Sequence, residues 1–207
     1  MSEQGQPGER GWQPGPGDVV LEDAAAIRAL AHPARLLATE LLFARRGVAL
    51  TATELAAEAG LTPSAMSYHL RALERHGLVV RAEATGDERQ RPWRAAGEQV
   101  VVRSGGSGAG EQTANRAATD LLLGAMLERL AASLAALSAR AHREDPEWRV
   151  GGLFPTTLHL SAAETAELSR ELAAVVERYA ARHERREPGT RTVAVTLALV
   201  PEAAPED

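Results

Sequence analysis

The sequence predicts a protein that is mainly α with small β content, and three observations lead to this prediction. Leucine and alanine recur at intervals of three and four residues in several segments, as they do along one face of a helix. Thr51, Thr62 and Ser161 stand where helices would begin, and Gly60 and Gly77 stand where helices would end. Only short runs have the apolar pattern of strands.

Residues 1–20 are expected to form a disordered tail, because they are rich in Gly, Pro, Gln and Glu and cannot bury an apolar face. They lack the apolar core of a signal peptide. Along the whole chain, no stretch approaches the roughly 20 uninterrupted apolar residues that cross a bilayer. We therefore expect a cytoplasmic protein with no membrane partner.

Residues 21–103 are expected to form one domain that begins with two helices. Their patterns meet at His32 and Pro33, since proline suits the first turn of a helix and disfavours continuation of the helix before it. The apolar residues that would face the core share helical spacing, and they are Ile27, Leu30, Leu36, Leu37, Leu41 and Leu42.

Two shorter helices follow, and the turn between them is tight. Thr51 and Glu54 form a capping-box pattern at the start of the third helix, which Gly60 ends. Thr62 precedes Pro63 at the start of the fourth helix, which Gly77 ends. Two short helices joined through a glycine-containing turn are the pattern of a helix-turn-helix.

Two strands are predicted directly after the fourth helix. Residues Leu78 to Ala84 and Pro92 to Ala95 have strand-forming composition and flank a polar turn at residues 86–91. A hairpin in this place is a wing, so residues 21–103 are predicted to form a winged helix-turn-helix domain. Trp93 is expected to pack the wing onto the core, since a large aromatic residue in a short strand usually anchors it.

Three strings within residues 22–97 follow one another in a characteristic order: ALAHPARLLATELL, then TATELAAEAGLTPSAMSYHLRALERHGLV, then a wing that ends in RPWRA. With these strings, residues 22–97 resemble the ArsR-type winged-helix regulators of bacteria. The RPWR wing is similar to a branch of this family whose members have an extra C-terminal region. The resemblance implies a DNA-binding transcription factor, and positions that match Ser64, Ser67 and Tyr68 lie at the DNA in this family.

Helical spacing predicts which side chains of the fourth helix can enter a major groove. The outward set is Pro63, Ser64, Ser67, Tyr68 and Arg71. His69 falls on the inner side with the leucines, and we expect it to be structural.

The wing concentrates Arg89, Arg91 and Arg94. These arginines could contact a phosphate or the minor groove, or they could belong to a solvated hairpin tip; we favour DNA contact.

Residues 104–110 are rich in Gly and Ser and are predicted to be a linker. A long helix is predicted for residues 111–145, with leucines spaced alternately by four and three. These are Leu123, Leu127, Leu130, Leu134 and Leu137. The seam is typical of a dimerisation helix, although it could instead pack only against its own chain.

Residues 146–200 are predicted to form a small α/β unit, and residues 201–207 a tail. The unit would have a strand at Thr156–Leu160, a helix from Ser161 to about Arg185 and a strand at Thr190–Val200. Trp148, Phe154 and Tyr179 could line a pocket for a small organic effector. We favour the alternative that they form the core of the unit, since aromatic residues are scarce here.

The composition argues against metal and enzyme chemistry. The chain has no cysteine, so thiolate metal sites and cysteine nucleophiles are impossible. Its histidines are scattered without the spacing of a metal site, and they are His32, His69, His76, His142, His159 and His183. Neither a phosphate-binding loop nor a nucleophile motif is present. We therefore expect no metal, no cofactor and no enzymatic activity.

These observations predict a transcriptional regulator that binds double-stranded DNA at an inverted repeat as a homodimer, with a small organic effector as a further partner. Two alternatives without enzymatic activity remain open. The winged helix could be a protein-interaction module, because a fold alone does not determine function. The protein could also be an architectural regulator that responds to no ligand.

Overall fold

In the computed structural model, two units of the chain are described separately: one is Pro14–Arg143 and the other contains Glu144–Asp207. The structure describes residues 14–45, 47–83, 91–103, 108–140, 146–148, 156–180, 182, 189–191, 193 and 195–200. The predicted tail at residues 201–207, the tip of the wing and most of the predicted linker lie outside these ranges.

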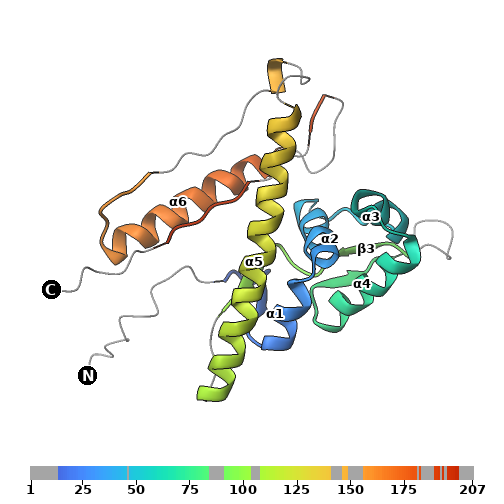
Figure 1. The fold of residues 1–207 in the computed structure, drawn as a ribbon, viewed down its shortest axis with the longest axis horizontal. Helices are drawn as coiled ribbons and strands as arrows, with labels where there is room; N and C mark the ends of the chain where they lie inside the picture. The colour runs from blue at the N-terminus through green and yellow to red at the C-terminus, as the bar shows by residue number, and fades with distance from the viewer. Residues whose placement is uncertain are drawn as a thin grey trace. The chain divides into compact units, whose positions relative to one another are not determined.

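The first unit contains the four predicted helices of the N-terminal domain (Figure 1). Their bounds are α1 Ala24–Leu30, α2 Pro33–Ala44, α3 Ala52–Ala59 and α4 Pro63–Arg75. Each begins at a side chain that accepts a hydrogen bond from the first turn, and these residues are Asp23, His32, Thr51 and Thr62. The predicted capping box is confirmed, since the Thr51 and Glu54 side chains each accept from the other's backbone N–H.

The turn between α3 and α4 depends on one glycine. Gly60 has φ of 64°, in the left-handed region that glycine adopts without steric cost. The N–H of Leu61 then donates to the carbonyl of Ala56 at 2.9 Å, which closes the end of α3. Thr62, two residues after Gly60, is the N-cap of α4. The two helices are therefore joined by the short turn that the sequence predicted.

A single apolar core holds these helices together. Its fully buried side chains come from every helix of the domain and from the wing, and the largest are Trp93, Ile27, Leu42, Leu55, Met66, Leu70, Leu73, Leu78 and Val79. Burying a side chain of this size contributes on the order of 1.5–3 kcal/mol. The buried positions on α4 recur at helical spacing, which leaves the opposite face of that helix to the solvent.

The wing is a small antiparallel sheet. β2 (Val79–Arg81) pairs with β3 (Trp93–Ala95), and Arg81 lies opposite Trp93. Leu50 bridges Trp93 on the other side, with the N–H of each residue donating to the carbonyl of the other. The predicted hairpin is therefore confirmed at its base, and Trp93 is buried as expected.

A second small sheet was not predicted. β1 (Val19–Leu21) pairs in parallel with β4 (Val100–Val102). Val19 and Val20 had been assigned to the disordered tail, and this boundary was wrong. Strands of three residues have no recognisable alternation, and their partners lie far apart in the sequence, so no local pattern indicated them.

The long helix is α5, Ala109–Arg140. It begins within the predicted linker and confirms the predicted helix through Arg140. Its first half packs against α1, where Ala118 and Leu122 are buried. The side-chain amide of Asn115 donates to the carbonyl of Glu22 at 2.7 Å, and Arg129 forms an ion pair with Glu40 on α2. These contacts place the start of α5 in the first unit.

The second unit contains a short 3-10 helix, η1 (Pro146–Trp148), and α6 (Ala162–Ala180). Ser161 and Glu164 form the predicted capping box of α6. The predicted strands at Thr156–Leu160 and Thr190–Val200 are wrong. Residues 156–160 and the described part of 190–200 are not paired in any sheet. Apolar composition favours a strand, but a strand also needs a hydrogen-bonded neighbour. The helix had been extended to about Arg185, and α6 ends at Ala180.

Candidate nucleic-acid interface

The outer face of α4 has the polar side chains that the sequence predicted for DNA contact. Pro63, Ser64, Tyr68 and Arg71 are exposed, and Ser67 is half-buried. Tyr68 is the most notable of them, since 62 % of its surface is accessible. Met66, Leu70 and Leu73 hold the opposite face of the helix in the core. The helix therefore presents two hydroxyl groups, a phenol and a guanidinium group to solvent from a rigid support.

His69 lies on the inner side of α4, against the beginning of α2. Its ring is 4.5 Å from the ring of His32, centroid to centroid, and Tyr68 meets it edge-on at 5.5 Å. His32 is itself the N-cap of α2, with Nδ1 accepting from the N–H of Ala34 at 3.2 Å. The histidine pair therefore joins α4 to the start of α2.

Burial lowers the pKa of both histidines below the usual value of about 6.5. Arg35 and the neighbouring ring add to the effect on His69, because positive charge disfavours a second proton nearby. Both rings are therefore expected to be neutral at physiological pH. Nδ1 of His69 is buried and has no hydrogen-bond partner among the described residues.

Two of the three predicted arginines lie at the described base of the wing. Arg91 and Arg94 are exposed, whereas Arg89 lies outside the described residues. Nη1 of Arg94 donates to the carbonyl of Ala95 at 3.3 Å. The positive charge of Arg91 and Arg94 is therefore accessible to a negatively charged partner.

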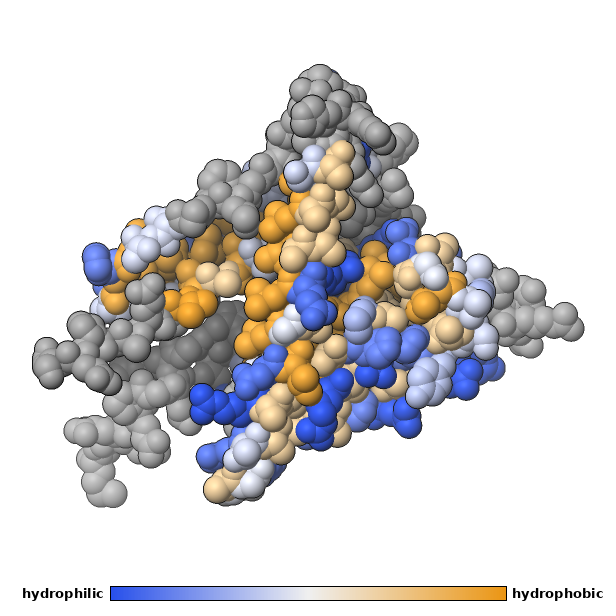
Figure 2. Space-filling model, viewed as in Figure 1, coloured by the Kyte–Doolittle hydropathy of each residue, from blue (hydrophilic) through white to orange (hydrophobic). Residues whose placement is uncertain are grey.

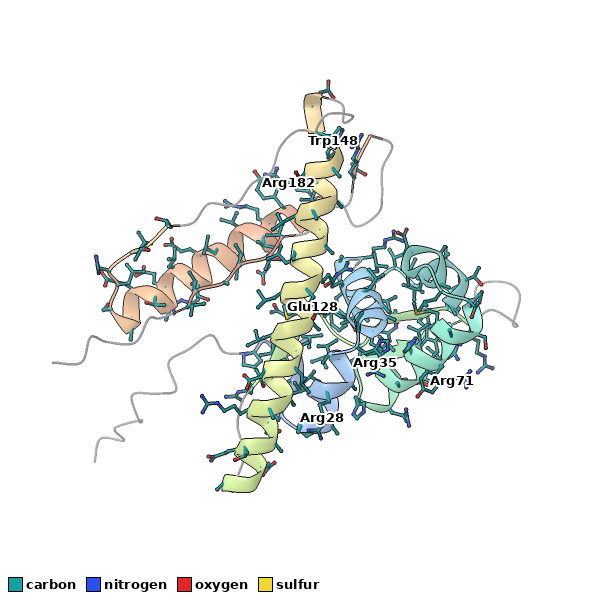
Figure 3. The ribbon with its side chains drawn as sticks, in the orientation of Figure 1. Arg28, Arg35, Arg71, Glu128, Trp148 and Arg182 are labelled. Carbon is teal, nitrogen blue, oxygen red and sulfur yellow. The ribbon has the colours of Figure 1, made fainter. Side chains whose placement is uncertain are left out.

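Two further arginines lie near this surface, and the sequence analysis did not assign them to it. Arg35 on α2 donates from Nε to the carbonyl of Ala29, and Tyr68 and Arg75 of α4 are close enough to affect the pKa of its guanidinium group. Arg75 is exposed in the last turn of α4. Figure 3 shows Arg35 and Arg71 within the helical domain, together with Arg28 on α1. The position of Arg35 in the HPAR string was the only sequence signal, and that string did not indicate what its side chain contacts.

The predicted leucine seam is largely exposed on α5. Leu123, Leu127 and Leu137 are 51 %, 64 % and 41 % accessible, and Leu130 and Leu134 are half-buried. Figure 2 shows an apolar strip running along this helix. The buried positions Ala118 and Leu122 lie on another face, so packing of α5 within its own domain does not use the seam.

By length and composition, Ala109–Ala139 could cross a membrane. One such helix is weak evidence of a membrane span, because core helices of soluble proteins pass the same test. Glu128 and Arg129 interrupt the apolar run near its middle, and charged groups are costly at the centre of a bilayer.

The predicted effector residues are only partly described. Trp148 is half-buried and Tyr179 is exposed, while Phe154 lies outside the described residues. An arginine covers each described ring: Arg191 is 4.7 Å from the centroid of Trp148, and Arg182 is 4.1 Å from that of Tyr179. The rings are thus arranged as cation–π pairs on the second unit.

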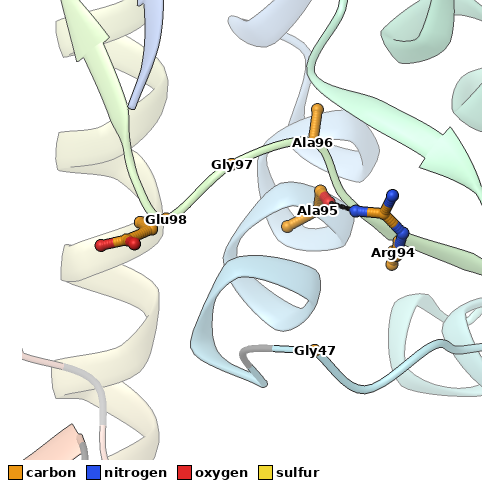
Figure 4. Close-up of a pocket in the computed structure, with 6 residues that line it drawn as sticks. All are labelled: Gly47, Arg94, Ala95, Ala96, Gly97 and Glu98. Atoms are coloured by element: carbon orange, nitrogen blue, oxygen red, sulfur yellow. Dashed lines mark hydrogen bonds between the residues drawn. The ribbon is translucent and has the colours of Figure 1, made fainter. Parts of the chain in front are cut away.

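A hollow of about 250 Å³ lies instead in the first unit, and none of the predicted effector residues lines it. Figure 4 shows its lining, which consists of Gly47, Arg94, Ala95, Ala96, Gly97 and Glu98. The hollow is open and shallow. Among the described residues, no group of three or more His, Asp or Glu side chains could hold a metal ion.

Comparisons with known proteins support the assignment of the first unit. A family described as a helix-turn-helix domain matches residues 30–82, which span α2 to the start of the wing. None of the curated proteins with which the sequence was compared matches it.

Three solved structures are similar to parts of the chain. A MarR-family protein of Mycobacterium tuberculosis in complex with salicylic acid is 20 % identical, with a TM-score of 0.27, and the match covers 73 % of this chain and 84 % of that one. Its complex with p-aminosalicylic acid is 20 % identical, with a TM-score of 0.28 and coverage of 73 % and 87 %. A point mutant of ZitR from Lactococcus lactis is 18 % identical, with a TM-score of 0.28 and coverage of 73 % and 73 %.

These TM-scores are too low to support any argument about this chain. The assignment of a helix-turn-helix domain therefore rests on the family match and on the geometry of α3, α4 and the wing. Residues 30–82 form a helix-turn-helix domain to which β3 adds a wing, and α4 is the helix that enters the major groove in DNA-binding members of this class.

Proposed function

We propose that the protein is a transcriptional regulator that binds double-stranded DNA at an inverted repeat as a homodimer. The observation that carries this proposal is the outer face of α4. It presents exposed polar and basic side chains from the second helix of a helix-turn-helix, the element that reads base edges in this class. No enzymatic activity is part of the proposal.

The chemistry of each side chain suggests its role. Ser64, Ser67 and Tyr68 lie in the first half of α4, where such helices contact bases. Arg71 lies one turn later and can bond a guanine or a phosphate. Pro63 begins the helix and brings its first turn close to the DNA.

The wing arginines Arg89, Arg91 and Arg94 are proposed to contact phosphates or a narrow minor groove. The net charge of the chain is −5, so binding must depend on local positive charge of this kind.

The seam on α5 supports the dimer. Exposed leucines aligned along one helix leave an apolar strip that soluble proteins usually cover, and a second copy of the same helix covers it in register. The ion pair of Arg129 with Glu40 and the buried Asn115 tie α5 to the domain that contains α4. A dimer through α5 would therefore place two reading helices in a fixed relation.

The remaining parts of the proposal rest on the sequence. The resemblance to ArsR-type regulators suggests a bacterial, cytoplasmic protein, and the second unit is the proposed site for a small organic effector. Trp148, Phe154 and Tyr179 are the candidate contacts there. A soluble protein agrees with the polar contacts that α5 makes with Glu22, which precedes α1, and with Glu40 on α2.

The test is selection of binding sites from a random duplex library with the full-length protein, followed by measurement of Kd for the selected and a scrambled site. We expect a specific site bound at least 10³-fold more tightly than the scrambled one, in the range typical of specific regulators.

Arg71→Ala should weaken binding to the selected site. Arg170→Ala, which removes an exposed arginine from α6, is the matched control and should leave affinity unchanged. Failure to enrich any sequence, together with equal affinity for all duplexes, would remove the proposal and favour a protein-interaction module.

A further inference from the structure

Arg81 lies where the chain leaves the paired strands at the base of the wing. It is the last residue of β2, and its guanidinium carbon lies 3.6 Å from the centroid of the Trp93 ring. Its Nη1 also donates to the carbonyl of Arg91 at 2.8 Å. One side chain therefore holds the outgoing strand against the returning strand through a cation–π contact and a hydrogen bond.

The ring beneath Arg81 is a fixed platform. Trp93 is 1 % accessible, and its backbone N–H and carbonyl bond to Leu50 at 2.7 and 2.8 Å. Leu50 directly precedes Thr51, the N-cap of α3. Because β3 is bonded to Leu50 on one side and to β2 on the other, the ring cannot shift without disturbing the helix-turn-helix itself.

Further hydrogen bonds join the two strands next to Arg81. The N–H of Ala82 donates to the carbonyl of Pro92 at 2.9 Å, next to the bond between Arg81 and Arg91. On the other side, the charged groups of α4 that act on Arg81 are Glu74 and Arg71. The Arg81 side chain thus reaches across from β2 to the returning strand and lies close enough to α4 for Glu74 and Arg71 to affect it.

We propose that Arg81 is a positioning residue for DNA binding, which fixes the base of the wing so that Arg91 and Arg94 meet the DNA. This inference rests on the proposed function. Nη1 of the guanidinium is engaged by the carbonyl of Arg91, and the face of the same group lies against the Trp93 ring, so the wing base holds this side chain in one orientation. The two contacts of Arg81 hold the wing base in its binding-competent orientation before DNA is bound, and this lowers the conformational cost of binding.

The experiment is a double-mutant cycle that joins Arg81→Met to Arg91→Ala in the full chain, read as Kd for the selected DNA site. Arg91→Ala removes a wing side chain but keeps the carbonyl that Arg81 bonds. We expect Arg81→Met alone to weaken binding about two- to fivefold, equivalent to about 0.5–1 kcal/mol at 1.4 kcal/mol per tenfold. In the Arg91→Ala background the same change should have a smaller effect, because fewer wing contacts remain to be positioned.

Two further variants separate positioning from charge. Arg81→Lys keeps the charge but cannot stack on Trp93 and bond Arg91 with the same planar group, so it should also weaken binding. Arg103→Met removes an arginine at the end of β4, where it pairs with Glu22, and should leave affinity unchanged. Circular dichroism and the thermal midpoint of each variant establish that it is folded.

The outcomes distinguish this inference from the proposed function. If the unmodified protein binds no duplex DNA, both fail together. If it binds and Arg91→Ala weakens binding, three results overturn the role of Arg81 alone. They are unchanged affinity of Arg81→Met, full affinity of Arg81→Lys, and strictly additive effects of Arg81→Met and Arg91→Ala, which would indicate an independent phosphate contact.

Discussion

His69 and His32 are the residues whose protonation should affect folding most directly. Their rings lie against each other between α4 and α2, and the charged group that faces both is Arg35, with the Tyr68 ring at the edge of His69. His69 is half-buried and His32 is exposed, so a proton on His69 would lose more solvation, and a proton on either ring would lie close to the positive charge of Arg35. The folded state therefore disfavours a protonation that the unfolded chain accepts freely.

This difference predicts that the free energy of unfolding falls as the solution becomes acidic. Because the folded pKa values of both histidines are lowered, their contribution is fully present above the unfolded pKa of about 6.5 and is lost as the pH falls through the folded values. Urea unfolding between pH 7.5 and pH 5 measures the effect. His69→Gln should flatten the profile in this window, and a profile parallel to that of the unmodified protein would contradict the prediction.

Single side chains on α4 and on the wing should act on DNA binding in different ways. Tyr68→Ala and Ser67→Ala should change sequence preference and cost about 1–3 kcal/mol at one base position. Arg91→Ala and Arg89→Ala should weaken binding to all sequences and lower the salt slope by about one unit each. Measuring Kd for a matched site and for random DNA at several salt concentrations tests both. If the Tyr68 and Ser67 variants keep the full ratio of specific to random affinity, α4 does not read bases through them.

At the scale of elements, the sequence predicted best where one residue controls the local backbone. Thr51, Gly60 and Thr62 determine the ends of α3 and α4, and helical spacing alone indicated that Tyr68 would face outward. The stacking of His69 on His32 and of Arg81 on Trp93 could not be predicted, because each contact joins residues from different elements. The apolar run at residues 195–200 indicated a strand that the structure does not pair.

The exposed seam of α5 predicts that the dimer depends on this helix. Leu127→Asp combined with Leu134→Asp should dissociate it, since each substitution puts a charge into an apolar interface. Leu121→Asp is the matched control, because Leu121 is 58 % accessible but lies about 120° or more around the helix from the seam. It should leave the dimer intact.

Sedimentation at micromolar concentration measures the oligomeric state of each variant. A monomeric unmodified protein, or equal dissociation by the control, would show that the seam is not the interface.

For the whole molecule, a dimer with two-fold symmetry would impose the same symmetry on its DNA site. Two copies of α4 held by paired α5 helices should occupy half-sites about one helical turn apart, roughly 10 base pairs, or a multiple of that distance. Footprinting of the selected sites with the unmodified protein measures the spacing and the symmetry. Protection that is consistently asymmetric, on sequences without an inverted repeat, would contradict a symmetric dimer.

The parallel pairing of β1 with β4 also has a mechanical consequence. The chain enters helices α1 to α4 through β1 and continues from β4 toward α5, and the strands are joined by bonds that include Val19 N–H to Gln99 and Arg103 N–H to Leu21. Tension between the residues before β1 and those after β4 would slide the strands along each other, so that their hydrogen bonds share the load instead of opening in turn. We therefore expect this strand pair, together with the packing of α5 on α1, to resist a pulling force applied to the chain on the two sides of helices α1 to α4.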